Sequence, residues 1–507
     1  MNNKPEEGTT PSKNQGTYAF WQGANTDHLS EEERELLGYL AKGLIFEKPD
    51  CLMLRCRMTG AELKSEELRG LAEVAKNFGG GYADVTTRAN FQIRDISFTD
   101  GIAALQALRE IQLVPAVRGL NNLRNVTVSP TSGFGRFDVF DVIPLARSIN
   151  EALLFHPDLQ GLPGKFNIGL DSGGAISVAS ESNDIGLIAV STSDGVKFRM
   201  SFADIRKGET IATDTGWLLH PDQVLDVVSA TVKIFLREGD FKVRLRSRVK
   251  FVIEQLGLDK FMRLVIEELG FSPELSPARS MPSHRDKTAY CGIWEQADKD
   301  FCYLGVVGAA GRVTALQMTA IADIAETWGN GTIRLTTKQT CIIPFVKKDD
   351  VERVVSKLRE IGLSISSQIA GAIVACTGSQ GCGYSATDTK LHSKQLIDFL
   401  NDEVQLDEPV NIHFTGCTFS CAQTYIGDIG LLGVKSKGQE CYHLFLGGGA
   451  DQNKNSSRIF KALPLTEVFS VVKQLLLLFK NQGQCGESFN NFVNRVGADD
   501  LSKMIHT

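Results

Sequence analysis

Long apolar stretches are missing from this chain of 507 residues. The most apolar run, Leu475–Phe479, is flanked by Lys473 and Lys480 and is far too short to cross a bilayer. The segment from Met1 to Thr17 is polar, so it holds no recognisable secretory signal and is expected to be a disordered tail. We therefore expect a cytoplasmic protein, in which thiols stay reduced.

A basic charge balance and a dinucleotide-binding signature are also missing. The formal net charge is −6, which argues against general binding of nucleic acids. The glycine-rich segment 305–311 lacks the G-x-G-x-x-G spacing and predicts a strand and a turn instead. No other segment carries a nicotinamide or flavin fingerprint. The length exceeds what one hydrophobic core normally supports, so two or more domains are expected.

Four of the 11 cysteines form two close pairs. Cys376 and Cys382 enclose five residues, and Cys417 and Cys421 enclose three. Thiolates bind soft or borderline metals, so the four predict an iron-sulfur cluster or a tetrahedral zinc site, and the spacing alone leaves both open, together with four unrelated buried cysteines. The other seven are expected to be buried small apolar residues: Cys51, Cys56, Cys291, Cys302, Cys341, Cys441 and Cys485.

The chain repeats itself. Residues 81–88 match residues 331–338 at an offset of 250, and residues 184–187 match residues 428–431 at an offset of 244. A tandem duplication with copies near 51–257 and 301–497 explains both offsets. The symmetry is broken at the cysteines, because copy one has Val126 and Ser132 where copy two has Cys376 and Cys382.

Each copy begins with a pattern that alternates strands and helices. In copy one this predicts a strand over 51–57, a helix over 65–78, a strand over 83–93 and a helix over 101–110. This order predicts an α+β half, and two such halves are expected to associate about a pseudo-twofold axis. The rest of each copy predicts an α/β domain, with helices over 223–237 and 465–480.

The segments around the cysteines carry a family resemblance. Cys376-Thr377-Gly378-Ser379, His413-Phe414-Thr415-Gly416-Cys417 and Ser420-Cys421-Ala422-Gln423 closely resemble the nitrite and sulfite reductase family. The resemblance runs from about Trp21 onward and implies a [4Fe-4S] cluster on Cys376, Cys382, Cys417 and Cys421. It also implies a sirohaem whose iron shares Cys421 with the cluster.

The resemblance implies a three-domain fold of the α+β class. Two ferredoxin-like halves would form one domain, and two α/β domains would bind the sirohaem and the cluster. The expected parts are an N-terminal extension over 1–50, a ferredoxin-like half over 51–120, a substrate-binding and sirohaem-binding domain over 121–257, a connector over 258–300, a second half over 301–365 and a cluster-binding domain over 366–507.

Three further motifs resemble the family's substrate-binding segments. They contain Arg88, Arg124 and the pair Lys165 and Asn167. The resemblance implies that these residues bind and orient an anionic substrate, and that Arg88 and Arg124 also face the carboxylates of the sirohaem. Cations are needed because both ligands are anionic. Gly164 departs from the pattern, since the family commonly has a basic residue there.

Position 167 distinguishes the branches of the family. Nitrite reductases generally carry asparagine there and sulfite reductases a second lysine, so Asn167 favours nitrite. The resemblance therefore implies reduction of nitrite to ammonium with electrons from a ferredoxin or a similar small donor protein. A sulfite reductase, a precorrin-3B synthase and a non-catalytic electron-transfer or redox-sensing protein are the alternatives. The last would need the cluster but not the three cations.

Overall fold

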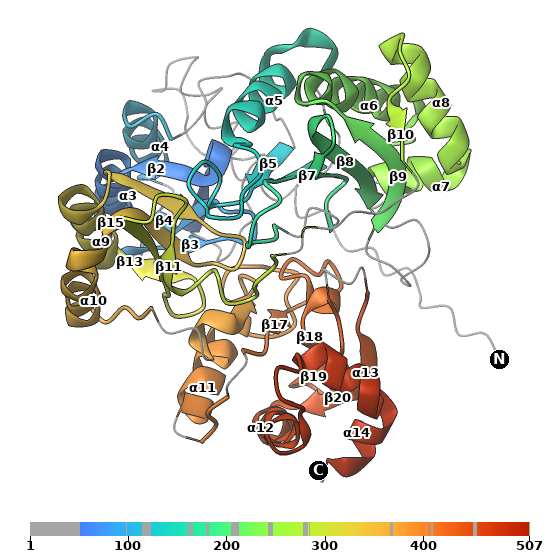
Figure 1. Cartoon of the computed structure of the whole chain (residues 1–507). Helices are drawn as coiled ribbons and strands as arrows, with labels where there is room; N and C mark the ends of the chain where they lie inside the picture. The colour runs from blue at the N-terminus through green and yellow to red at the C-terminus, as the bar shows by residue number, and fades with distance from the viewer. Residues whose placement is uncertain are drawn as a thin grey trace.

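The computed structural model describes residues 51–97, 99–113, 123–159, 162, 166–178, 182–203, 212–241, 247–276, 282, 284–365, 369–401, 403–406, 409–449 and 454–505. Helices and sheets alternate through them, as Figure 1 shows, and the expected α+β class is confirmed. No helix in these ranges is long and apolar enough to cross a membrane. The predicted extension over 1–50 lies outside the described residues.

Two small antiparallel sheets are built from the first part of each copy. One has the strand order β1-β4-β3-β13 and the other β11-β12-β15-β14-β2. The first sheet joins β1 (Cys51–Cys56), β4 (Phe91–Ser97), β3 (Tyr82–Val85) and β13 (Arg312–Thr314). The second joins β11 (Gly292–Glu295), β12 (Phe301–Val306), β15 (Cys341–Lys347), β14 (Thr332–Leu335) and β2 (Glu62–Lys64). Each sheet therefore ends in a strand contributed by the other copy.

Four helices cover these sheets on the left of Figure 1. They are α3 (Ser65–Phe78), α4 (Gly101–Glu110), α9 (Ala315–Trp328) and α10 (Val351–Glu360). The helices predicted over 65–78 and 101–110 are confirmed. In α3, Leu68, Leu71, Ala72 and Ala75 are buried because their spacing places them on one face, and α3 packs against α9.

The strand exchange confirms the duplication. The amide of Ser65 donates to the carbonyl of Gly331 at 2.9 Å, and the equivalent amide of Ala315 donates to Gly81 at 2.8 Å. Left-handed backbone angles repeat at the same offset of 250, for example at Ala89 and Gln339, where φ is 49° and 64°. Side chains rarely adopt this region, so its repetition reflects one backbone design used twice.

Each exchanged strand forms an ion pair with the strand beside it. The cation lies on the exchanged strand in one pair and on its neighbour in the other. Arg312 of β13 lies opposite Asp84 of β3, with 2.9 Å between Nε and Oδ1. Glu62 of β2 lies opposite Arg334 of β14, with 2.5 Å between Oε2 and the guanidinium. Because Glu62 and Arg312 are equivalent positions, pairing like halves would bring Glu62 to an aspartate and Arg312 to an arginine. The charges thus favour exchange between the two different copies.

We expect Glu62→Arg to lower the free energy of unfolding by about 3 kcal/mol, because it places a guanidinium against the buried Arg334. The double variant Glu62→Arg, Arg334→Glu restores an ion pair and is expected to recover most of the loss. Urea unfolding of both variants measures this. Equal stability of the single variant and the unmodified chain would contradict a specifying role for the pair.

Two larger sheets are built from the second part of each copy, and they share one topology. The strand orders are β10-β9-β8-β7-β6-β5 and β16-β17-β18-β19-β20, in which two parallel pairings are followed by antiparallel ones. The first contains β5 (Leu123–Val128), β6 (Phe166–Asp171), β7 (Ile185–Thr192), β8 (Gly195–Ala203), β9 (Ala212–Leu219) and β10 (Glu274–Leu275). The second contains β16 (Ile373–Ala375), β17 (Ile412–Thr415), β18 (Ile429–Ser436), β19 (Gln439–Leu446) and β20 (Ser457–Pro464).

Helices accompany both larger sheets. The first sheet has α5 (Ile143–Phe155), α6 (Val224–Glu238), α7 (Val249–Leu256) and α8 (Leu258–Leu269), and the second has α11 (Thr389–Asn401), α12 (Leu465–Gln482), α13 (Phe489–Val496) and α14 (Ala498–Met504). One hydrophobic core runs through the first larger sheet and both small sheets, and a separate core lies under the second larger sheet. The helices predicted over 223–237 and 465–480 are confirmed to within two residues.

Two local expectations need correction. The strand predicted over 83–93 is two strands, β3 and β4, because the chain reverses in a turn where Ala89 adopts φ 49° and Thr86 exchanges hydrogen bonds with Asn90 and Ala89. Cys51 is only partly buried and Cys485 is exposed, so neither is a core residue. The segment 258–300 contains α8, β10 and β11, while the predicted domain boundaries themselves stay a prediction.

Candidate functional site

The four paired cysteines line one pocket of about 150 Å³. Cys376 directly follows β16, and Cys417 follows β17 after one glycine. These strands are parallel neighbours, so their carboxyl ends lie side by side and bring the two cysteine segments together. The amide of Cys376 donates to Phe414 at 2.9 Å, which ties the first segment to β17.

Gly416 makes the approach of the two segments possible. A Cβ atom at this position would lie 1.6 Å from Oγ of Ser385, so a larger residue would force the loops apart. The amide of Gly416 donates to Sγ of Cys376 at 3.2 Å, and Oγ1 of Thr389 lies 3.4 Å from the same sulfur. Hydrogen bonds to sulfur are a common feature of iron-sulfur sites.

Burial raises the pKa of Cys376 above its usual value and that of Cys417 to about 11. Repulsion from neighbouring thiolates contributes to both increases. Positively charged iron would lower the pKa of these thiols again, because a metal ligand must be the thiolate form. Four thiolates on two neighbouring loops are the donor set that a [4Fe-4S] cluster takes, so the residues present fit such a cluster.

Cations surround the same pocket. Arg55, Arg88, Arg94 and Lys390 line it together with the four cysteines. Three of them come from copy one and Lys390 from copy two. Positive charge beside four thiolates and an anionic macrocycle offsets the cost of removing those anions from water.

Of the three residues predicted to bind the substrate, Arg88 lines the pocket. It lies in the turn between β3 and β4, where Nδ2 of Asn125 donates to its carbonyl at 3.0 Å. The side chain of Arg124 and all of Lys165 lie outside the described residues. The predicted roles of these three cations stay predictions.

Asn167 lies in β6 and is buried, but it does not line the cysteine pocket. Its amide donates to Oδ2 of Asp184 at 3.0 Å, and Asp184 pairs with Arg248 at 2.8 Å. Its side-chain oxygen Oδ1 has no hydrogen-bond partner in the described part of the chain. A buried polar atom without a partner is costly, so a ligand or a residue outside the described ranges is expected beside it.

Arg55, Arg94 and Lys390 line the pocket but were not predicted from the sequence. For two of them a signal exists in the duplication, since positions 250 residues further on hold Gly305 and Pro344 in place of Arg55 and Arg94. The same comparison distinguishes Arg88 from Lys338. A residue that is charged in one copy and uncharged at the equivalent position of the other is therefore a candidate for the cysteine pocket, whose cysteines are not duplicated.

Lys338, the copy-two equivalent of Arg88, contacts a histidine. Its Nζ lies 3.2 Å from Nε2 of His413, whose Nδ1 lies 3.0 Å from the carbonyl of Gln423. Burial, and then the charge of Lys338, lowers the pKa of His413 to about 3. The ring is therefore neutral at physiological pH, so Lys338 lies beside a neutral partner, whereas Arg88 lines the cysteine pocket.

We expect His413 to make stability depend on pH. Its pKa is lower in the folded chain than the ordinary value of 6.5, so the chain takes up a proton when it unfolds between pH 3 and 6.5. The free energy of unfolding therefore falls as the pH is lowered from 6.5 to 3. The slope from this residue reaches at most about 1.4 kcal/mol per pH unit. Urea unfolding at several pH values should show a smaller slope in His413→Gln. The exposed His156→Gln is the control, and equal slopes in all three proteins would contradict the assignment.

Comparison with known proteins follows the same division of the chain. The family model of the nitrite and sulphite reductase 4Fe-4S domain matches residues 119–272 and 370–507. The model of the nitrite/sulfite reductase ferredoxin-like half domain matches residues 46–111 and 294–361. The matches occur in pairs, as expected for a duplicated chain, and the second 4Fe-4S match contains all four cysteines of the pocket.

Relatives cover nearly the whole chain. A ferredoxin–nitrite reductase of Leptolyngbya laminosa is 30% identical over 84% of this chain and 86% of its own length. An assimilatory ferredoxin-dependent nitrite reductase of Haloferax mediterranei is 27% identical over 89% of this chain and 83% of its own. The solved structure of the Mycobacterium tuberculosis NirA protein has the same fold, with a TM-score of 0.79, 24% identity and coverage of 89% of this chain and 85% of that one. The chain therefore belongs to the nitrite and sulfite reductase family, and its cofactors are a [4Fe-4S] cluster and a sirohaem.

Proposed function

We propose that this protein reduces nitrite to ammonium with electrons from a ferredoxin-type donor. The observation that carries the proposal is the pocket itself, in which Arg88 lies with four cysteines that suit a cluster. The neutral Asn167, where the sulfite branch of the family has a lysine, supports nitrite as the substrate. Relatives that carry the name ferredoxin–nitrite reductase support the same activity.

In this proposal Cys376, Cys382, Cys417 and Cys421 would hold the cluster, and Cys421 would also bind the sirohaem iron. When bound, the cluster and the sirohaem would supply the electrons for the reduction. Each nitrite takes up six electrons and eight protons, and yields one ammonium and two waters. Arg88, Arg124 and Lys165 bind and orient the anion, and Arg88 and Arg124 also face the carboxylates of the macrocycle. We assign Lys165 the transfer of protons, since a lysine gives up its proton when neighbouring cations lower its pKa.

A separate donor protein follows from what the sequence contains. No dinucleotide-binding motif is present, so the electrons do not come from a nicotinamide bound to this chain. A ferredoxin is the proposed donor. The cysteines fit a reducing cytoplasmic location, since none of them forms a disulfide in the described part of the chain.

Turnover of purified protein with reduced ferredoxin tests the proposal. Ammonium and sulfide are measured with nitrite and with sulfite as substrate, after absorption spectra have established full sirohaem content. We expect ammonium from nitrite, with kcat/KM for nitrite above that for sulfite. Faster formation of sulfide would favour the sulfite reductase alternative, and full cofactor content without either product would favour a precorrin-converting or electron-transfer role.

A further inference from the structure

A buried arginine joins copy one to the cluster segment of copy two. Arg94 lies in β4 and is 3% exposed. Its Nε donates to Oδ2 of Asp84 at 2.8 Å, and another guanidinium nitrogen donates to Oγ1 of Thr377 at 2.7 Å. Thr377 directly follows the ligand Cys376. A guanidinium suits this task because its planar fork holds two partners in fixed directions.

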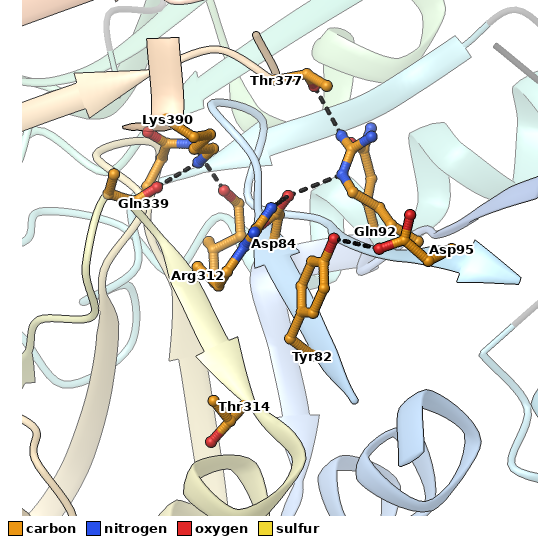
Figure 2. Close-up of polar contacts among 12 residues, drawn as sticks. Tyr82, Asp84, Gln92, Asp95, Arg312, Thr314, Gln339, Thr377 and Lys390 are labelled. Carbon is orange, nitrogen blue, oxygen red and sulfur yellow. Dashed lines mark hydrogen bonds and ion pairs between the residues drawn. The ribbon is translucent and has the colours of Figure 1, made fainter. Parts of the chain in front are cut away.

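Asp84 holds a second cation that comes from the exchanged strand. Arg312 of β13 donates to both carboxylate oxygens of Asp84, at 2.9 and 3.2 Å. Figure 2 shows Asp84 beside Arg312, with Thr377 and Lys390 over the same end of the sheet. Asp84 therefore orients the guanidinium groups of Arg94 and Arg312. Through Asp84 and Arg94, the exchanged strand β13 is connected to Thr377 beside Cys376.

Lys390 adds a third cation. Its Nζ donates to the carbonyl of Ala310, and its neighbour Thr389 donates to the carbonyl of Cys376 at 2.8 Å. Asp95, which accepts a hydrogen bond from Tyr82 at 2.8 Å, is the other carboxylate of this group. The group thus contains three cations and two carboxylates, so its net charge is positive. Two of the cations, Arg94 and Lys390, line the pocket.

These cations stay charged at neutral pH. Burial and the neighbouring Arg312 lower the pKa of Arg94 to about 10, and burial lowers the pKa of Lys390 to about 8. Both values lie above 7. A cluster held by four thiolates is an anion, and reduction makes it more negative, so a nearby cation favours the reduced state.

We propose that Arg94 is a positioning residue that fixes the Cys376 segment against the first small sheet, and that the charges of Arg94 and Lys390 raise the reduction potential of the cluster. The proposal depends on the cluster and not on the substrate, so it holds for a nitrite or a sulfite reductase. It separates two effects: the bond to Thr377 determines how firmly the cluster is retained, and the two charges determine how easily it is reduced.

A redox titration followed by electron paramagnetic resonance tests the charge effect on anaerobically purified holoenzyme. We expect Arg94→Gln to lower the equilibrium constant for cluster reduction about tenfold, which is a shift of about 59 mV to more negative potential for a one-electron couple. Arg94→Lys keeps the charge and should restore the potential. Lys390→Gln should also lower it, whereas Arg353→Gln makes the same charge change on the exposed surface of α10 and should not.

Release of iron to a chelator tests the positioning effect. Thr377→Val removes the hydroxyl that Arg94 binds, and it should release iron several-fold faster with an unchanged potential. Arg94→Lys should release iron faster as well, because it lacks the fork. Arg94→Gln with full iron and an unchanged potential would overturn the proposal. If that variant retains no cluster, an unchanged potential in Lys390→Gln would overturn the charge effect, and unchanged iron release in Thr377→Val would overturn the positioning effect.

Discussion

Replacing Cys421 with alanine is expected to abolish nitrite reduction and to change the visible absorption spectrum. Cys421 is the most exposed of the four thiols, which suits a sulfur that two cofactors would share. Loss of a residue that supports a metal ligand typically costs 10- to 100-fold in activity, so loss of a ligand shared by two cofactors should exceed about 100-fold.

The position of Cys421 is held from copy one. Oγ1 of Thr87, the neighbour of Arg88, donates to the carbonyl of Cys421 at 2.9 Å. This hydrogen bond connects the turn of Arg88, which is expected to bind the anion, to Cys421, the expected shared ligand. Cys485→Ala is the matched control, because Cys485 is an exposed thiol that does not line the pocket. Full turnover and an unchanged spectrum in Cys421→Ala would show that the shared ligand is another residue.

In copy one, the positions equivalent to Cys382 and Cys376 carry no cysteine and have structural roles. Ser132 stands where copy two has Cys382, and its hydroxyl donates to Asp141 at 3.0 Å and accepts from the amide of Val142 at 2.8 Å. Val126, the equivalent of Cys376, is fully buried. After duplication the same loop therefore supports an ordinary structural network in one copy and a cofactor in the other.

The parts of the site that are local in sequence could be predicted, and the parts that depend on distant segments could not. Each cysteine pair lies on one loop after one strand, so its spacing carries the signal. The contact between Arg94 and Thr377 joins residues 283 positions apart, and no pattern near either residue indicates it. The repeat itself was visible in the sequence, because both copies keep the same residues at matching turns.

The exchange of β2 and β13 between the sheets is a similar case. Both strands have three residues, which is too short for a period of two to be recognised. Their partners are selected by ion pairs, Glu62 with Arg334 and Arg312 with Asp84, that only the three-dimensional register brings together. The division of 83–93 into two strands was hidden for another reason. It depends on a left-handed angle at Ala89, a residue type that does not signal a turn.

Replacing Asn167 with lysine is expected to raise sulfite turnover relative to nitrite. Sulfite is a dianion near its second pKa and nitrite a monoanion, so one more cation should favour sulfite. A charge-assisted hydrogen bond contributes about 1–3 kcal/mol, which corresponds to a factor of roughly 5 to 150 in relative specificity. The measurement is the ratio of kcat/KM values for the two anions, with sirohaem content determined first.

The duplication supplies the control for this experiment. Asn411 is the copy-two equivalent of Asn167, and its amide donates to Asp428 at 2.8 Å, as that of Asn167 does to Asp184 at 3.0 Å. Asn411→Lys thus adds the same charge at the equivalent position of copy two, in a residue that does not line the pocket with Arg88. We expect it to leave the ratio unchanged. If both variants shift the ratio equally, or if Asn167→Lys with full sirohaem leaves it unchanged, position 167 does not determine the choice of anion, and the preference for nitrite must come from Arg88, Arg124 and Lys165 alone.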